Sequence, residues 1–227
     1  MTTLRTVKGS RCKLVAVIAS PADLRFALQM KQPPDLFEFR LDCLGDVVNQ
    51  LERKLSILSA PVIITARDPR EGGIGGLSFE KRRELLSRFL PRAKYLDVEL
   101  RSARAFKPLL AQAQKRDVRV ILSFHDFQST PLSRSLCTKA FAAKKHGADI
   151  FKVATRTDTP AELARLVDFI MDCGMNLPIS AMGIGKLGVL SRLLLAYCGS
   201  VFNYASCERP TVEGQLPIEL LRSALAR

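Results

Sequence analysis

The amino-acid sequence predicts a closed (β/α)8 barrel, in which eight parallel strands alternate with eight helices. Short apolar runs rich in β-forming residues recur about every 25–30 residues, and each is followed by a segment with helical spacing. Runs such as Val-Ile-Ile at 62–64 lack polar alternation, which indicates strands covered by helices. An open doubly wound sheet is the alternative, but strict alternation favours the barrel. The 227 residues, 47% of them hydrophobic, accommodate one such domain over 1–227.

The predicted strands are 13–19, 35–41, 61–67, 94–100, 118–124, 149–155, 177–182 and 200–205. The predicted helices are 22–30, 46–58, 79–90, 103–116, 132–146, 161–173, 187–197 and 217–226. Ser78 is a partial N-terminal cap for the third helix and Thr159 begins the sixth, while Gly147 and Gly174 end the fifth and sixth. Two β-to-α loops are long, namely 68–77 and 206–216. In a barrel such loops gather at the carboxyl ends of the strands, where active sites lie.

The net charge of +13, from 35 Lys and Arg against 22 Asp and Glu, raises the possibility of a polyanionic partner. No basic run exceeds three residues and the chain has no Trp, so a dedicated nucleic-acid groove is not favoured. The runs Lys81-Arg82-Arg83, Lys115-Arg116 and Lys144-Lys145 are interpreted as solvated helix faces. No apolar run approaches the ~18 residues of a membrane span, and the chain is expected to be cytoplasmic.

Six cysteines, at 12, 43, 137, 173, 198 and 207, allow three disulfides by number. None has the Cys-x-x-Cys spacing of a zinc or redox site, and most lie in apolar runs, which favours reduced thiols packed as small hydrophobic side chains. With two histidines in the chain, we expect no metal, and we expect no cofactor.

Polar residues late in strands are the candidates for a site in a barrel. Those on or just after strands are Glu38, Arg40, Arg67, Glu99, His125 and Lys152, with Met182 on the seventh. Loops and helix starts contribute Glu71, Arg192 and Gln215.

Lys152 is the most informative of these, because it interrupts the apolar strand Asp-Ile-Phe-Lys-Val-Ala-Thr. Alternation places 150, 152 and 154 on one face of the strand and 151, 153 and 155 on the other. Burial lowers the pKa of an amine toward the range in which it is a nucleophile, so an inward lysine is suited to form a Schiff base. The alternatives are an ion pair with an interior carboxylate such as Glu38 or Glu99, or an outward position.

His125 follows the apolar strand Val-Ile-Leu-Ser-Phe and precedes Asp126. Imidazole moves protons near neutral pH, so His125 beside a buried lysine is a candidate acid and base, although alone it is as readily structural. His146, at a helix end, is interpreted as a partner of the helix dipole. Arg40, Arg67 and Arg192 are expected to converge and bind a substrate carboxylate. The glycines at 72, 73, 75 and 76 lack a phosphate-loop register.

The sequence resembles the type I 3-dehydroquinate dehydratase family in segments that occur in family order along almost the whole chain. They are Glu38-Phe39-Arg40-Leu41-Asp42, Arg67 with Glu71-Gly72-Gly73, Ser123-Phe124-His125-Asp126-Phe127, Ile150-Phe151-Lys152-Val153-Ala154, Met182-Gly183 with Ser191-Arg192, and Gly214-Gln215. The resemblance implies that the chain dehydrates 3-dehydroquinate in the shikimate pathway, through an imine on the lysine. It also implies a homodimer, with no nucleic acid or membrane partner.

Residue by residue, the resemblance implies that Lys152 condenses with the C3 ketone and that His125 moves the protons. Glu71 would hold His125 and favour its protonated form, and Arg192 would grip the carboxylate. The remaining positions would bind or order the rest of the substrate: Glu38, Arg40, Arg67, Met182, Thr211 and Gln215.

Two segments depart from the family. The loop at 206–216 corresponds to the family's lid and is called the lid loop below. In the family it commonly reads Ser-Ala-Pro-Gly-Gln, whereas here it reads Thr211-Val212-Glu213-Gly214-Gln215. Glu213 is expected to add negative charge near an anionic substrate and to loosen the loop, which predicts a raised KM. The spacing between Met182 and Arg192 is also longer than usual. A class I aldolase, or a basic barrel that binds a polyanion beside a vestigial site, remains as an alternative function.

Overall fold

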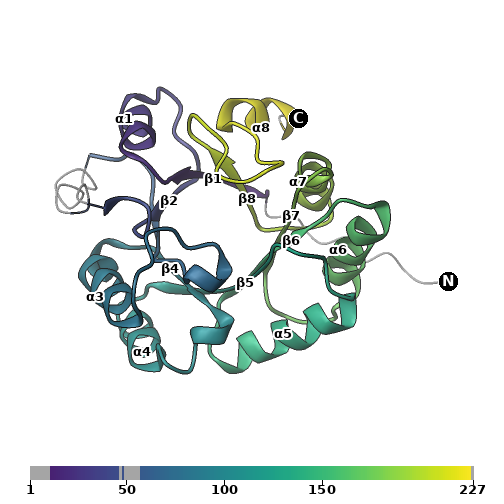
Figure 1. The fold of residues 1–227 in the computed structure, drawn as a ribbon, viewed down its shortest axis with the longest axis horizontal. Coiled ribbons are helices and arrows are strands. Elements are labelled where there is room, and N and C mark those ends of the chain that lie inside the picture. Colours follow the sequence, from purple (N-terminus) through teal and green to yellow (C-terminus); the bar gives the residue numbers. More distant parts are fainter. Residues whose placement is uncertain (1–10, 46–47, 49–56, 226–227) are drawn as a thin grey trace.

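The computed structural model describes residues 11–45, 48 and 57–225. Its eight strands are β1 (Lys13–Ile18), β2 (Leu36–Arg40), β3 (Val62–Thr65), β4 (Tyr95–Glu99), β5 (Arg119–Asp126), β6 (Ile150–Arg156), β7 (Ile179–Ile184) and β8 (Phe202–Ser206). They pair in parallel in the order β7-β6-β5-β4-β3-β2-β1-β8. The sheet curls into a nearly closed barrel with helices around it (Figure 1). The predicted fold class is therefore confirmed.

The helices are α1 (Pro21–Gln29), α3 (Phe79–Phe89), α4 (Lys107–Lys115), α5 (Ser133–Lys145), α6 (Pro160–Asp172), α7 (Gly188–Tyr197) and α8 (Ile218–Leu225). Short 3-10 turns lie at η2 (Pro69–Glu71), η3 (Leu90–Arg92) and η4 (Leu100–Ser102). The helix predicted at 46–58 lies outside the described part of the chain, apart from residue 48 and residues 57–58. No helix of the described residues is long and apolar enough to cross a membrane.

Local sequence accounts for most element ends. The Ser78 hydroxyl accepts a hydrogen bond from the Lys81 N–H at the start of α3, and Thr159 and Glu162 cap α6 reciprocally. The prediction of a helix from residue 103 was wrong: α4 begins at Lys107, because Pro108 suits a first turn and a 3-10 turn precedes it. β5 runs to Asp126, so His125 lies within the strand rather than after it.

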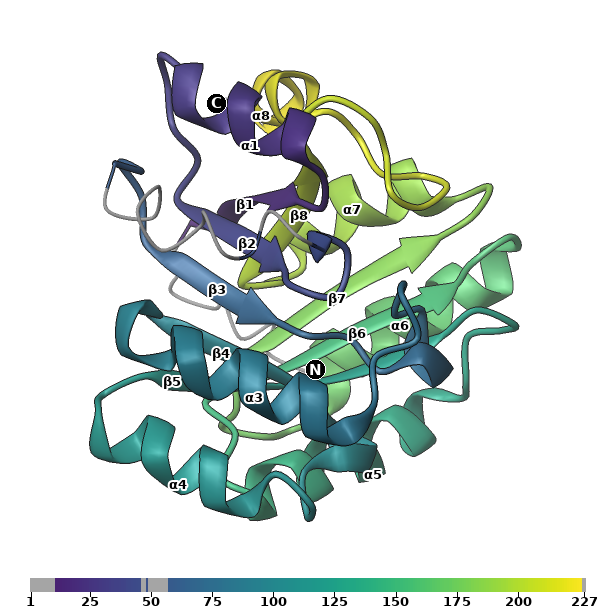
Figure 2. The ribbon, with the colours of Figure 1, turned by 60° about the vertical axis from the view of Figure 1, so that its left-hand side comes forward.

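Alternation along the strands divides the buried residues into two apolar clusters. One fills the barrel interior and includes Ile63, Ile121 and Ile150. The other includes Phe151 and Val153 and lies between the strands and the surrounding helices. Figure 2 shows these helices on the outside of the strands. Lys152 lies on β6 between Ile150 and Ala154 of the first cluster, and with the other polar side chains of the interior it forms the site described below.

The junction between β7 and β8 differs from the other seven, because the described strands form no paired ladder across it. The Val201 N–H donates to the Ile179 carbonyl at 2.9 Å, and serine side chains make further links. The Ser180 hydroxyl donates to the Phe202 carbonyl at 3.1 Å, and the Ala181 N–H donates to the Ser200 hydroxyl at 3.1 Å. We call this junction the seam.

Candidate active site

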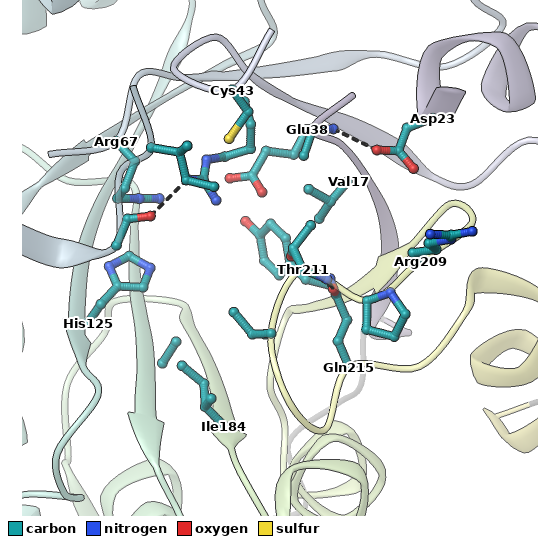
Figure 3. A pocket seen from close by; sticks show the side chains of 18 of the residues that line it. Val17, Asp23, Glu38, Cys43, Arg67, His125, Ile184, Arg209, Thr211 and Gln215 are labelled. Carbon is teal, nitrogen blue, oxygen red and sulfur yellow. Dashed lines mark hydrogen bonds between the residues drawn. The ribbon is translucent and has the colours of Figure 1, made fainter. Parts of the chain in front are cut away.

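A cavity of about 670 Å³ lies at the carboxyl ends of the strands (Figure 3). It is lined by side chains from the strands on one side and by the lid loop, drawn in yellow, on the other. Ten of the residues predicted to form the site line it, namely Glu38, Arg40, Arg67, Glu71, His125, Lys152, Met182, Arg192, Thr211 and Gln215. Glu99, the other candidate, does not line the cavity and instead pairs with Arg67 and Arg82.

Lys152 points from β6 into the barrel and is 4% exposed. Its Nζ donates to Glu38 Oε1 and to Asp97 Oδ2, each at 3.1 Å, and lies 3.9 Å from the centre of the Tyr204 ring. The inward orientation and the ion pair with a carboxylate, considered above as alternatives, are thus both present. The second partner is Asp97 rather than Glu99. The arrangement gives a buried amine two carboxylates that can take its proton.

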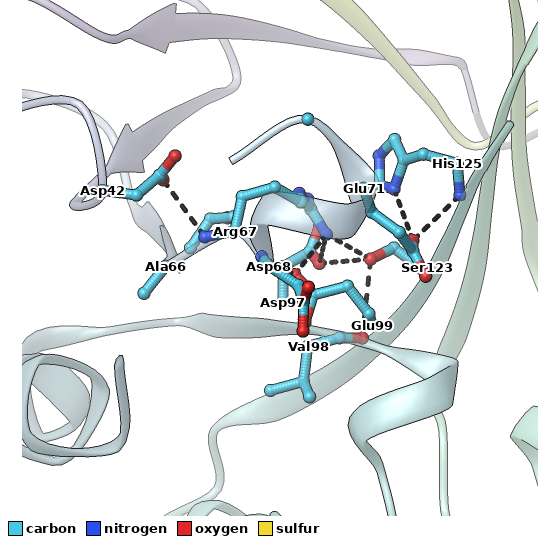
Figure 4. Close-up of polar contacts among 12 residues, drawn as sticks. Asp42, Ala66, Arg67, Asp68, Glu71, Asp97, Val98, Glu99, Ser123 and His125 are labelled. Atoms are coloured by element: carbon cyan, nitrogen blue, oxygen red, sulfur yellow. Dashed lines mark hydrogen bonds and ion pairs between the residues drawn. The ribbon is translucent and has the colours of Figure 1, made fainter. Parts of the chain in front are cut away.

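Asp97 is a site residue that the sequence reasoning missed. It is 1% exposed and accepts hydrogen bonds from Arg67, Lys152 and the Ser123 hydroxyl (Figure 4). Burial alone would raise its pKa, but the charges of Arg67 and Lys152 lower it, so Asp97 is ionised. Strand alternation was the available signal, since it places Tyr95, Asp97 and Glu99 on one face.

Arg67 is held by acceptors on two neighbouring strands. Its guanidinium donates to Asp97 at 3.0 and 3.1 Å, to Glu99 at 3.1 Å and to Ser123 at 2.6 Å. Burial opposes its charge, but the carboxylates of Asp97 and Glu99 raise its pKa above the usual value. Most of its donors are therefore used within the protein, although the side chain borders the cavity.

The interpretation of Arg82 as part of a solvated helix face was wrong. Arg82 is 2% exposed, and its guanidinium donates to the Ala66 carbonyl, to Asp68 and to Glu99. Its neighbours in the sequence, Lys81 and Arg83, are exposed as predicted. Local charge does not distinguish the three, because only the helix face that turns toward β3 and β4 has buried carboxylates to pair with.

His125 and Glu71 form a pair at the edge of the cavity. Glu71 Oε2 lies 3.1 Å from His125 Nδ1 and accepts from the His125 backbone N–H at 3.0 Å. Burial raises the pKa of Glu71 to about 7. Burial, followed by the charges of Arg67 and Lys152, lowers the pKa of His125 well below 6.5. Near neutral pH the imidazole is therefore neutral, which differs from the protonated form that the family resemblance implied, and it is suited to accept a proton.

The loop that carries Glu71 depends on two glycines. Gly72 has φ of 84° and ends the turn η2, and a Cβ there would approach the Phe127 ring to 2.7 Å. A Cβ on Gly73 would collide with the Arg67 carbonyl oxygen. These residues allow the chain to fold back and place Glu71 under His125, so the glycines serve the turn rather than a phosphate.

Arg192 differs from Arg67 in having no carboxylate partner among the described residues. It is 2% exposed, and its Nε and Nη1 donate to the carbonyls of Gly214 and Tyr204 at 3.0 and 2.9 Å. Burial lowers its pKa to about 10, so it is charged at neutral pH. A buried and uncompensated guanidinium beside a cavity is a site for an anion.

The lid loop is closed on itself by the side chain of Gln215. Gln215 Oε1 accepts from the backbone N–H and hydroxyl of Thr211 at 2.8 and 3.0 Å. Glu213 is not an isolated negative charge, since it pairs with Arg156 at 3.1 Å. Because both side chains are exposed to solvent, this pair contributes little to stability.

Arg40 and Met182 complete the wall of the cavity. Arg40 donates to both oxygens of Asp42, at 3.0 and 2.7 Å, and these bonds fix it at the end of β2. Met182 is 3% exposed on β7, where it lies opposite Ala154 in the ladder with β6. The arrangement thus combines a buried amine, an acid–base pair and the Arg192 guanidinium around one cavity. We call this guanidinium free, because no described carboxylate pairs with it.

Comparison with known proteins agrees with this chemistry. The type I 3-dehydroquinase family matches residues 19–227. The 3-dehydroquinate dehydratase of Aromatoleum aromaticum is 36% identical over 208 residues, which cover 85% of this chain and 79% of that protein. The enzyme of the same name from Pyrococcus abyssi is 34% identical over 192 residues, which cover 84% and 86%. The crystal structure of the Aquifex aeolicus 3-dehydroquinate dehydratase superposes with a TM-score of 0.78 at 28% identity, covering 94% of this chain and 99% of that one.

Proposed function

The chain belongs to the type I 3-dehydroquinase family, lyases that dehydrate 3-dehydroquinate in the shikimate pathway, and from this premise we propose how its residues carry out the reaction. Lys152 is the nucleophile, His125 is the acid and base, and Arg192 holds the substrate carboxylate. The observation that carries the proposal is the buried amine of Lys152, paired with two carboxylates in the cavity that also contains the Glu71–His125 pair. With the family assigned, the aldolase interpretation is not retained.

In the first step a proton passes from the Lys152 ammonium to Glu38 or Asp97, which hydrogen-bond it. The free amine adds to the C3 ketone, and the resulting carbinolamine loses water to give an iminium ion. The electron-poor iminium makes the neighbouring C2 proton acidic. The lysine thereby supplies an electron sink from the protein itself.

In the second step neutral His125 removes the C2 proton and becomes an imidazolium ion. The electron pair from the C2–H bond moves into the iminium and gives an enamine. The enamine pushes its electrons back to form the C1–C2 double bond and restores the iminium as the C1 hydroxyl leaves, and the imidazolium gives its proton to that hydroxyl, which departs as water. Glu71 accepts from the Nδ1 side, which leaves Nε2 as the base. Such proton transfer contributes about 10²–10⁴-fold to rate. Hydrolysis of the imine then releases 3-dehydroshikimate.

Arg192 is assigned to the substrate carboxylate because its charge has no carboxylate partner in the described residues. The remaining cavity residues are assigned to the ring hydroxyls and to ordering the site: Glu38, Arg40, Arg67, Met182, Thr211 and Gln215. Those that are bound by protein groups, such as Arg40 and Arg67, act mainly by holding their neighbours in place.

The test combines 3-dehydroquinate with borohydride, which reduces an imine to a stable secondary amine. Mass spectrometry is expected to locate the adduct on Lys152, and the conjugated enone of the product is followed by its absorbance. The Lys152→Ala variant should form no adduct and no product. Wild-type turnover in that variant would refute the imine mechanism, and Lys139→Ala, on α5, serves as a matched lysine control.

Two further properties are proposed from the family resemblance, namely a homodimer and a cytoplasmic location. Light scattering on the purified protein is expected to give twice the mass of the 25.1 kDa chain. A monomeric mass at micromolar concentration would contradict the dimer.

A further inference from the structure

Tyr204 has a buried hydroxyl group that forms no hydrogen bond within the described structure. The residue lies on β8, is 3% exposed and borders the cavity. Its ring centre is 3.9 Å from Lys152 Nζ, and its backbone carbonyl accepts from Arg192. One residue therefore contacts both the amine and the free guanidinium of the site.

An unpartnered buried hydroxyl destabilises a folded protein, so nearly all buried hydroxyls find a partner. The exceptions call for a reason. Tyr204 lines the cavity, so a ligand bound there can supply the missing acceptor. Burial, followed by the charges of Glu38 and Asp97, raises the pKa of Tyr204 well above 10. The hydroxyl therefore keeps its proton and is a donor.

We propose that the Tyr204 hydroxyl donates a hydrogen bond to the oxygen of the carbonyl group that Lys152 attacks, and assists the departure of that oxygen as water. The inference rests on the proposed imine mechanism. For the C–N bond to form, the carbonyl carbon must come within bonding distance of Lys152 Nζ. Its oxygen is then the substrate acceptor brought closest to Tyr204, whose ring packs against Nζ. His125 and Arg192 are assigned to other parts of the substrate.

The protons balance as follows. The ammonium gives one proton to Glu38 or Asp97, and the C–N bond forms as the carbonyl π electrons move to oxygen, where Tyr204 stabilises the developing charge. A nitrogen proton moves to that oxygen and gives the neutral carbinolamine. The carboxylate that took the ammonium proton returns it to the carbinolamine hydroxyl, to which Tyr204 keeps donating its hydrogen bond. The C–O bond breaks, water leaves, and the iminium remains.

Tyr204→Phe is the decisive variant, because it keeps the ring against Lys152 and removes only the hydroxyl. We expect borohydride trapping in a single turnover to slow roughly 100-fold, the loss typical of removing one donor to a developing oxyanion. Imine formation then limits turnover, so the deuterium isotope effect of substrate labelled at C2 should shrink toward one. The unfolding temperature should stay the same or rise, because an unpartnered hydroxyl is gone.

Tyr95→Phe is the matched control. Tyr95 is also 3% exposed inside the barrel, but it is not among the residues that line the cavity, and its hydroxyl has a partner, since it accepts from Arg119 at 3.4 Å. This variant should trap the adduct at the wild-type rate.

Three outcomes would overturn the inference. If Tyr204→Phe traps the adduct at the wild-type rate, imine formation does not depend on the hydroxyl. A lowered unfolding temperature with parallel loss of adduct and turnover would make the role structural. If wild type itself forms no adduct while it produces the enone, the imine mechanism fails first, and this inference fails with it.

Discussion

In the Glu71→Gln variant an amide of nearly the same size replaces a carboxyl group that is buried against His125. Burial raises the pKa of Glu71 from 4.5 to about 7, so the folded protein holds this proton more tightly than the unfolded chain does. Ionising Glu71 as the pH rises through that interval therefore destabilises the fold. At about 1.4 kcal/mol per pH unit, ionising Glu71 lowers the free energy of unfolding by roughly 3 kcal/mol above pH 7. Below pH 4.5 this loss is absent.

The assay is denaturant unfolding of wild type and variant across that pH range. The free energy of unfolding of the variant should rise relative to that of wild type by roughly 3 kcal/mol as the pH increases from about 4.5 to 8. His125 contributes with the opposite sign, because its lowered pKa adds stability as pH rises toward 6.5, but burial, Arg67 and Lys152 lower it in both proteins. Carboxylates with lowered pKa, such as Asp97, lose their contribution only below pH 3.8.

Activity should move in the other direction. The amide can donate to Nδ1 and stabilise the tautomer that carries a proton on Nε2, which removes the base, so turnover should fall on the order of 10²–10⁴-fold. Glu84→Gln, at an exposed carboxylate on α3, is the control and should leave both quantities unchanged. A stability difference that stays flat with pH, or a variant with full activity, would refute the reasoning about the pair.

Three further perturbations test other parts of the site. His125→Ala should still form the trapped adduct on Lys152 while turnover collapses; equal loss of both would make His125 structural. Arg192→Lys should raise KM about 10- to 100-fold with a smaller change in kcat, because a point charge cannot replace the guanidinium fork, and steady-state kinetics would show otherwise if kcat alone fell. Glu213→Gln should raise KM by at most about fivefold, and less at high salt, because its pair with Arg156 is partly exposed. A tenfold rise that persists in salt would mean that Glu213 holds the lid loop more strongly than this geometry supports.

The barrel and the inward position of Lys152 were predictable because both follow from periodicity. An apolar strand with one inward face assigns a direction to each side chain, and Lys152 lies on the face with Ile150 and Ala154. The helix starts at Ser78 and Thr159 were also predictable, because each capping residue bonds to a residue only three positions further along the chain.

The hydrogen-bond and ion-pair partners of these side chains were much harder to predict from the sequence than the direction in which each side chain points. Lys152 meets Asp97 and Glu38 across 55 and 114 residues of sequence, so the pairing depends on the register of five strands. The burial of Arg82 depends in the same way on carboxylates that β4 and the loop after β3 bring beneath α3. The unpartnered Tyr204 hydroxyl is a property of the assembled cavity and has no counterpart in the local sequence.

The seam gives the barrel a preferred line of mechanical weakness. Elsewhere neighbouring strands are joined by backbone ladders, but here Ser180 and Ser200 supply side-chain links. The Ser180 link ends on β8, which the lid loop follows, and Asn203 of β8 also donates to the Arg192 carbonyl of α7 at 2.8 Å. Hydrogen exchange should therefore be faster for strand amides along this line than at the other strand junctions, and opening there would widen the cavity between Met182 of β7 and Tyr204 of β8.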